Sequence, residues 1–339
     1  MKKTFLMVAA VAAMLIATGF IACKPNSPQT PKEVDIYVAG YDHSGTNVAK
    51  VWKNGKELYD LTDGSKLTEA SSVFVVGGDV YTAGYESNGT NQVAKVWKND
   101  KELYELTDGS NYAYASSIFV ADDKVYTAGY ESNGTKYVAK VWRKGSEHLV
   151  LTNGSNDAQA LSVFVAGSNV YTAGYESNGT KEVAKVWKKG SEHLVLTNGS
   201  NDAKARSVFV VGDDVYTAGY EKNGTKYVAK VWKNKKEIFQ TDGSKDALAY
   251  SVYVVGEDIY VAGLEGKAAK VWKNKEELYE LAGKGEAQSI VVYNGDVYVA
   301  GYESDGPKNN IAKVWKNGKE LYSLADNGNA KSIFIAERE

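Results

Sequence analysis

Short runs of alternating apolar and polar residues recur along almost the whole chain after residue 33. In the unit from Ser72 to Ser116, the run SVFVV is followed by VYTAGYE, VAKVWKN and ELYELT. Turn-forming residues separate these runs, including the Asn-Gly of SNGT. Alternation with a period of two, broken by Asn-Gly turns, is typical of antiparallel strands joined by tight hairpins. The pattern therefore predicts a meander of four strands per unit.

Tryptophan marks the repeat. All seven Trp residues occupy one position in the third run, at successive spacings of 45, 45, 45, 45, 40 and 43 residues. They are Trp52, Trp97, Trp142, Trp187, Trp232, Trp272 and Trp315. A period of this size indicates an array of supersecondary units. One four-stranded sheet cannot cover both of its apolar faces, so the units must stack, either radially as a β-propeller or as an open solenoid.

The two ends of the array favour the closed arrangement. The first unit begins at Val34 with a second run, whereas the last unit ends with a lone first run, Lys331 to Glu337. If the spare strand completes the N-terminal sheet, no sheet edge stays exposed. We therefore predict an all-β, seven-bladed β-propeller of four-stranded antiparallel blades over residues 34–339. Its first blade combines residues 34–62 with residues 331–337.

The N-terminal segment predicts an export signal. Lys2 and Lys3 precede an Ala-rich apolar run that ends at Cys23, the only cysteine. The sequence Phe20-Ile21-Ala22-Cys23 resembles the signal of bacterial lipoproteins, which implies that the cysteine carries the lipid and becomes the mature N-terminus. Simple secretion or an uncleaved membrane anchor is the alternative interpretation.

This resemblance divides the chain before the propeller into two parts. Residues 1–22 are expected to be the signal peptide, and residues 23–33, with three of the four prolines, an extended tether. We expect a lipid-anchored protein of the bacterial cell envelope, at the outer membrane or cell surface. A periplasmic location is the alternative.

The repeat VYTAGYESNGT, followed by VAKVWKN and ELYELT, resembles that of highly repetitive bacterial β-propeller lipoproteins. The resemblance covers residues 34–337 and implies a seven-bladed propeller. It implies no activity, because this group has no shared activity to transfer. The chain lacks the Gly-His and Trp-Asp pairs of tryptophan–aspartate repeats and the Ser-x-Asp-x-Gly-x-Thr-Trp box of sialidases. Function must therefore be inferred from the site.

Composition excludes several classes of function. A net charge of −2 offers no basic face for nucleic acid, and abundant apolar residues exclude a disordered chain. One cysteine permits no internal disulfide. Of three His residues, His148 and His193 lie at equivalent outer positions of adjacent units, too far apart to share zinc. We expect a monomer with no cofactor, no metal and no nucleic-acid partner.

Residues repeated in every unit are expected to serve the packing of blades. They include the Trp residues, a serine that opens each first strand, and a lysine two positions before each Trp. These lysines are Lys50, Lys95, Lys140, Lys185, Lys230, Lys270 and Lys313. The glutamates of the GYE motif (Glu86, Glu131, Glu176, Glu221 and Glu303) are expected at blade edges, paired with those lysines.

Diversity concentrates at the start of the first strand, in the pattern x-Ala-x-Ser. Residues two apart in an extended chain point the same way. We expect both x residues to surround the mouth of the central channel, on the face that carries the longer loops. The candidate ligand-binding residues are Glu69, Ser71, Tyr114, Gln159, Lys204, Arg206, Tyr250, Glu286, Gln288 and Lys331. The alternative is that these loop residues are simply unconstrained.

Three classes of function stay open. The mixture of Tyr, charges and amides suits a polar ligand with a stackable surface, a glycan or a peptide, and hence a membrane-anchored binding module. A carboxylate-dependent glycoside hydrolase or lyase needs two carboxyl groups at a fixed separation, and the variable positions offer only Glu69 and Glu286. A purely structural spacer is the third class. Because the units are so alike, we expect binding rather than catalysis.

Overall fold

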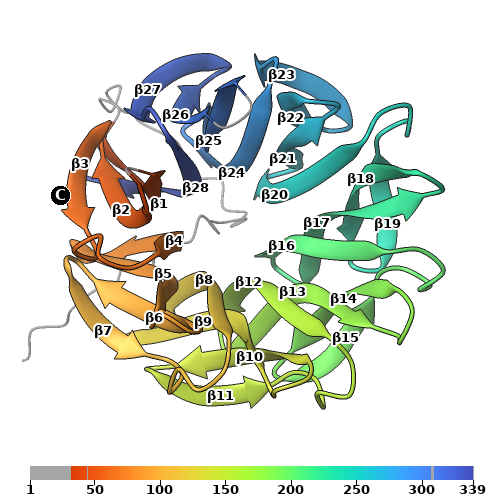
Figure 1. The fold of residues 1–339 in the computed structure, drawn as a ribbon. Coiled ribbons are helices and arrows are strands. Elements are labelled where there is room, and N and C mark those ends of the chain that lie inside the picture. Colours follow the sequence, from red (N-terminus) through yellow and green to blue (C-terminus); the bar gives the residue numbers. More distant parts are fainter. Residues whose placement is uncertain (1–31, 44, 307–308, 339) are drawn as a thin grey trace, which may run out of the picture.

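The computed structural model describes residues 32–43, 45–306 and 309–338. In these residues, 28 strands form seven four-stranded antiparallel sheets around a central axis (Figure 1). The predicted seven-bladed propeller is therefore confirmed. The predicted signal peptide (1–22), Cys23 and most of the tether (23–33) lie outside the described residues. No helix in the described part of the chain is long and apolar enough to cross a membrane.

Each blade has the same order of strands from the axis outward. The innermost strands are β28 (Gly328–Glu337), β4 (Thr68–Val76), β8 (Ala113–Ala121), β12 (Ala158–Ala166), β16 (Ala203–Val211), β20 (Ala247–Val255) and β24 (Gly285–Tyr293). The second strands are β1 (Val34–His43), β5 (Asp79–Ser87), β9 (Lys124–Ser132), β13 (Asn169–Ser177), β17 (Asp214–Asn223), β21 (Asp258–Glu265) and β25 (Asp296–Gly306). The third strands are β2 (Asn47–Lys53), β6 (Gln92–Lys98), β10 (Tyr137–Arg143), β14 (Glu182–Lys188), β18 (Lys226–Lys233), β22 (Ala268–Lys273) and β26 (Asn309–Lys316). The outer strands are β3 (Lys56–Asp60), β7 (Lys101–Glu105), β11 (Ser146–Val150), β15 (Ser191–Val195), β19 (Lys236–Gln240), β23 (Glu276–Ala282) and β27 (Lys319–Ala325). We number the blades in chain order, with β28 and β1–β3 as blade 1.

The last strand of the chain closes the ring. β28 pairs antiparallel with β1, from Val34 opposite Glu337 to Asp42 opposite Gly328. It also contacts the innermost strands β24 and β4 of the two neighbouring blades. The predicted return of the C-terminal segment to blade 1 is confirmed, and the strand begins three residues before Lys331.

The constant serines join neighbouring innermost strands. The Oγ atom of Ser72 accepts a hydrogen bond from the backbone amide of Ile118 in the next blade, at 3.2 Å. Equivalent bonds of 3.1–3.3 Å run from blade to blade around the ring. Their acceptors are Ser117, Ser162, Ser207, Ser251, Ser289 and Ser332. These serines therefore hold the blades in register around the axis.

The seven tryptophans fill the spaces between blades. Trp97 of blade 2 packs in one apolar cluster with Ala39 and Val51 of blade 1. Trp52 of blade 1 packs in the same way with Ala300 and Val314 of blade 7. All seven are 1–4% exposed. Burying side chains of this size supplies the apolar contact that one sheet lacks.

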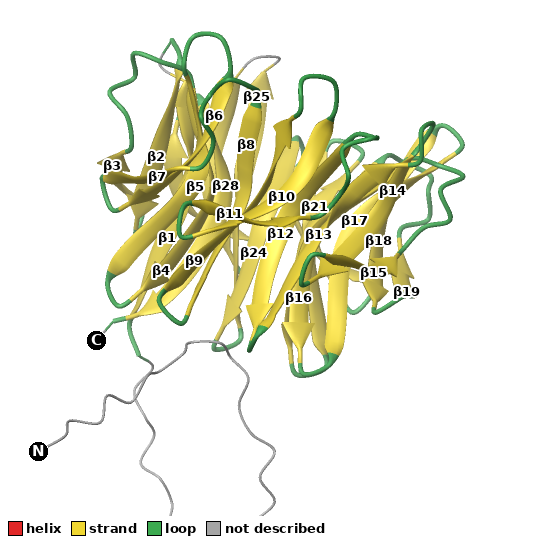
Figure 2. Cartoon of the chain, turned by 90° about the horizontal axis from the view of Figure 1, so that it is seen from below, coloured by secondary structure: helices red, strands yellow, loops and turns green. Residues whose placement is uncertain are grey.

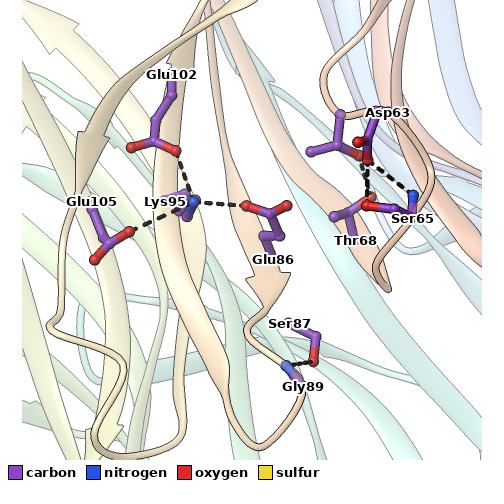
Figure 3. A network of polar contacts seen from close by, with 10 residues as sticks. Asp63, Ser65, Thr68, Glu86, Ser87, Gly89, Lys95, Glu102 and Glu105 are labelled. Atoms are coloured by element: carbon purple, nitrogen blue, oxygen red, sulfur yellow. Dashed lines mark hydrogen bonds and ion pairs between the residues drawn. The ribbon is translucent and has the colours of Figure 1, made fainter.

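The third-strand lysines pair with carboxylates of their own blade (Figure 3). Lys95 Nζ lies 2.7 Å from a carboxylate oxygen of Glu86 and 2.7 Å from one of Glu102. Lys140, Lys185, Lys230 and Lys313 pair equivalently with Glu131, Glu176, Glu221 and Glu303. The predicted pairing of the GYE glutamates with these lysines is confirmed.

The two faces of the ring differ. The innermost strands begin at one face, where the linkers between blades lead into them. The second strands end at the same face, as the pairing of Thr68 with Glu86 shows, so the turns that follow them also lie there. We call this the mouth face. The opposite hairpin face carries the tight turns, and the described chain both enters and leaves there, since Val34 pairs with Glu337. Figure 2 shows the ring edge-on, with the C-terminus at the hairpin face.

Candidate functional site

Every innermost strand carries a β-bulge next to its constant alanine. In β4, Ala70 pairs with Gly84 and Ser72 pairs with Ala83, so Ser71 has no partner on β5. The same shift recurs in all seven blades. The bulged residues are Ser71, Ser116, Leu161, Arg206, Tyr250, Gln288 and Lys331. Because a bulge re-aims the side chain of its extra residue, one backbone feature presents six different kinds of side chain in seven blades.

A glycine opposite each bulge makes the distortion possible. A Cβ atom on Gly84 would lie 1.9 Å from the backbone oxygen of Glu69, far inside van der Waals contact. In each of the other six blades, a Cβ on the opposing glycine would lie 1.9–2.0 Å from the equivalent backbone oxygen. They are Gly40, Gly129, Gly174, Gly219, Gly263 and Gly301. The constant Ala-Gly pair of the second strand is therefore the sequence signal of the bulge.

The residues that flank the constant alanines form what we call the mouth ring. Its members are Glu69, Ser71, Tyr114, Ser116, Gln159, Leu161, Lys204, Arg206, Leu248, Tyr250, Glu286, Gln288, Asn329 and Lys331. The alanines between them are completely buried, whereas all members except Asn329 keep part of their surface exposed. All ten predicted site residues thus lie together at the mouth face.

Six tyrosines stand behind the mouth ring. Each follows the Ala-Gly pair of a second strand. It pairs across the sheet with the mouth-ring residue that precedes the constant alanine, as Tyr85 pairs with Glu69. The other five are Tyr41, Tyr130, Tyr175, Tyr220 and Tyr302. The sequence prediction missed them, because residues constant in nearly every blade were attributed to packing.

Blades 2 and 3 bring several tyrosine rings together. The ring of Tyr114 is stacked on that of Tyr130, with 5.8 Å between centroids, and lies 5.1 Å from that of Tyr85. The rings of Tyr112 and Tyr137 also contact that of Tyr130, and their own centroids are 5.8 Å apart. Ser71 donates a hydrogen bond of 2.8 Å to the Tyr114 hydroxyl. One arc of the mouth ring is therefore an aromatic surface with polar tips.

The cations of the mouth ring lie over tyrosine rings. Lys204 Nζ is 4.3 Å from the ring centroid of Tyr175, and the Arg206 guanidinium is 5.4 Å from that of Tyr250. Lys331 Nζ lies 5.7 Å from the ring centroid of Tyr41. These distances are in the range of cation–π attraction, which orients a cation and leaves its hydrogen-bond donors free.

The two carboxylates of the mouth ring interact with neutral donors. The Asn47 side-chain amide donates a 3.0 Å hydrogen bond to Glu69, and the Tyr85 hydroxyl faces the same carboxylate. The Gln288 amide donates to Glu286, which the hydroxyls of Tyr250 and Tyr302 also face. Both carboxylates thus accept hydrogen bonds from neutral side chains and form no direct ion pair among the described residues.

Side chains of non-adjacent blades lie close enough near the axis to interact electrostatically. The charge of Arg206 in blade 5 acts on Tyr114 in blade 3 and on Lys331 in blade 1. Burial raises the pKa of Tyr220 to about 12, and it raises the pKa values of Tyr114 and Tyr250 as well. These hydroxyls are thus neutral hydrogen-bond donors at physiological pH.

Two other features are separate from the mouth ring. A cavity of about 590 Å³ between blades 5 and 6 is lined by apolar side chains that include Ile238, Ile259 and Trp272. Among the described residues, no group of three or more His, Cys, Asp or Glu side chains could hold a metal ion. His148 and His193 lie on outer strands, beside the rings of Tyr126 and Tyr171.

No family model matches this sequence, and no curated protein sequence matches it. Among solved structures, the chain is similar to the Trypanosoma rangeli sialidase in complex with sialic acid, with 9% identity, 88% of this chain and 56% of that chain covered, and a TM-score of 0.45. It thus spans little more than half the length of the sialidase.

Two further structures show weaker likeness. A Bacillus subtilis levansucrase is 9% identical, with 77% of this chain and 85% of that chain covered, and has a TM-score of 0.37. An α-L-arabinofuranosidase from Clostridium thermocellum is 13% identical, with 77% of this chain and 95% of that chain covered, and has a TM-score of 0.34. Likeness at this level does not transfer a ligand or an activity, so function rests on the residues of the site.

Proposed function

We propose that this protein is a binding module for a polar ligand, a glycan, that contacts the mouth ring. One observation carries the proposal: the bulge and its glycine are the same in seven blades, while the side chain presented there differs in almost every blade. A rigid scaffold that varies only the residues at one face is the usual design of a binding surface.

The chemistry of the ring favours a glycan over a peptide. Tyrosine faces such as that of Tyr114 stack on the apolar faces of sugar rings. Glu69, Glu286 and the amides of Gln159 and Gln288 accept and donate the hydrogen bonds that sugar hydroxyls need. A peptide remains the competing ligand.

We further propose that a lipid on Cys23 anchors the protein to the bacterial cell envelope. The described chain enters the propeller at the hairpin face, so the tether of residues 23–33 would leave from that face. Its eleven residues could reach at most about 35–40 Å when extended. Such an anchor would direct the mouth ring away from the membrane.

The binding proposal is tested with the full chain in detergent micelles on glycan and peptide arrays. The triple variant Tyr114→Ala, Arg206→Ala, Tyr250→Ala should lose binding. The control variant Lys101→Ala, Arg143→Ala, Lys236→Ala changes exposed residues of the third and outer strands and should bind normally. Unchanged binding by the first variant would refute the site. Binding of peptides alone would refute the glycan, and turnover lost in Glu69→Gln or Glu286→Gln would indicate a hydrolase or lyase instead.

The anchor is tested separately by cell fractionation. The Cys23→Ser variant should move from the membrane to the soluble fraction, because it lacks the thiol that would carry the lipid. A variant that stays in the membrane fraction would contradict lipid anchoring at this residue.

A further inference from the structure

Two cations of the mouth ring have no carboxylate partner. Lys204 forms an ion pair with Glu182 at 3.0 Å. In the described part of the chain, no carboxylate oxygen lies within the 4.0 Å ion-pair distance of Lys331 or Arg206. Both side chains are only partly exposed, so water does not fully replace the missing partners.

The lysines of the third strands provide the contrast. All seven have a carboxylate oxygen at 2.5–2.8 Å. The fold thus pairs its partly buried lysines closely wherever they serve packing. An unpaired lysine at a bulge of the innermost strand is an exception that packing does not explain.

The surroundings of Lys331 leave its charge uncompensated at close range. Burial lowers the pKa of the Lys331 amine, attraction by Glu69 and Glu286 offsets part of this effect, and repulsion by Arg206 adds to it. Both carboxylates already accept hydrogen bonds from amide side chains, Asn47 for Glu69 and Gln288 for Glu286. Lys331 and Arg206 therefore repel each other, and among the described residues neither has a carboxylate within ion-pair distance.

Each of the two cations is oriented by an aromatic ring. Tyr41 lies beneath the Lys331 amine and Tyr250 beneath the Arg206 guanidinium. Contact with a ring face does not use the N–H donors. Two oriented cations with free donors, facing each other near the axis, are a binding site for an anion.

We propose that Lys331 and Arg206 together bind a carboxylate of an acidic glycan, a polymer that contains hexuronic acids. This inference rests on the proposed glycan-binding function and specifies its substrate class. The carboxylate would accept hydrogen bonds from both side chains and relieve their repulsion. The nearby Glu69 and Glu286 would accept hydrogen bonds from hydroxyls of the same sugar, which a poly-glutamate peptide lacks.

The test compares each acidic probe with its neutral ester. Oligomers of galacturonic, glucuronic and mannuronic acid, and the same oligomers with methyl-esterified carboxyls, are titrated calorimetrically into the full chain in detergent. At least one uronate should bind, and its ester should bind about tenfold more weakly or worse, the value of one charge-assisted hydrogen bond. Uronates that bind no better than their esters would overturn the proposal.

Matched variants locate the binding charge. Lys331→Met and Arg206→Gln should each weaken uronate binding about tenfold and weaken binding of the ester much less. Lys101→Met and Arg143→Gln remove the same charges from exposed positions, one on an outer strand and one at the end of a third strand, and should change the binding of neither probe. Equal loss with the control variants would overturn the proposal, because it would show attraction by overall charge.

Failure of this inference differs from failure of the proposed function. If neutral glycans bind at the mouth ring and no uronate binds better, the acidic substrate class is wrong and the binding function stands. If a poly-glutamate peptide binds in place of every glycan, both are wrong.

Discussion

The backbone amide of Val73 in β4 donates a hydrogen bond of 3.2 Å to the Oγ atom of Ser332 in β28. These two residues are 259 positions apart in the chain, yet the bond is equivalent to the six others that join innermost strands. Ser332 therefore completes the ring, and the C-terminal strand contributes to the contacts of blade 1 with blades 2 and 7.

Removal of the C-terminal strand should destabilise the whole ring. A chain that ends at Asn327 lacks β28, which exposes the inner edge of β1 and breaks the contacts to β4 and β24. We expect a much lower urea midpoint and loss of a single cooperative transition, measured by tryptophan fluorescence. Ser332→Ala, which removes one hydrogen bond, should cost only about 1 kcal/mol. A truncated chain with the midpoint of the full chain would contradict closure.

Gly84→Ala tests the bulge that builds the mouth ring. The added Cβ would lie 1.9 Å from the Glu69 backbone oxygen, so the strand pair must separate. We expect a loss of at least about 2 kcal/mol in the free energy of unfolding. Gly283→Ala is the control, because its Cβ meets nothing within 4 Å, and it should be nearly neutral. Equal effects of the two substitutions would show that the bulge does not need glycine.

Lys331→Met and Lys95→Met should change stability in opposite directions at neutral pH. Lys331 carries an uncompensated charge, so its removal should raise the free energy of unfolding by about 1 kcal/mol. Lys95→Met leaves the Glu86 side chain, which is 17% exposed, without its cation. It should lower the free energy of unfolding by about 2 kcal/mol. Thermal denaturation of both variants checks the pair. If Lys331→Met is as destabilising as Lys95→Met, Lys331 is a packing residue.

The same two lysines predict opposite dependence on alkaline pH. Burial alone would lower the pKa of Lys95, but the hydrogen bonds that Lys95 donates to Glu102 and Glu86 outweigh burial and raise the pKa. The contribution of Lys95 to stability is therefore fully present below pH 10.5 and is lost as the pH rises through the raised pKa. The pKa of Lys331 is lowered, so its charge disappears first.

Binding of a uronate should therefore weaken as the pH rises through the lowered pKa of Lys331, at a pH below 10.5 and before ordinary lysines lose their charge. The other charged groups that face Lys331 are Glu69, Glu286 and Arg206, and burial raises the pKa of Tyr41 beneath it. Calorimetric titration at several pH values checks this, with Lys331→Met as the control that should lack the change. Affinity independent of pH in the wild-type chain would contradict the role of Lys331.

Most of the fold followed from the sequence because the repeat is nearly regular. The spacing of the Trp residues defined the blades, and the lone run from Lys331 to Glu337 predicted closure. Opposite charges at fixed positions, such as Lys95 and Glu86, also predicted a pairing that the structure contains. Each of these predictions needs only the period of a strand and the order of strands.

The architecture of the mouth ring needed information that strand periodicity does not supply. A simple alternation places Glu69 and Ser71 on one face, but it gives no sign that Ser71 is an extra, unpaired residue. The bulge depends on contact between Gly84 and the backbone of another strand. The tyrosines behind the ring, such as Tyr85, were overlooked because constancy between blades was taken to mean packing alone.

The location of a bound glycan tests the central claim most directly. A crystal structure of the chain with its tightest-binding oligosaccharide should place the sugar over the mouth ring, in contact with Tyr114, Arg206 and Tyr250. A sugar bound in the cavity between blades 5 and 6, or at the hairpin face, would contradict the claim that the seven bulges build the binding site.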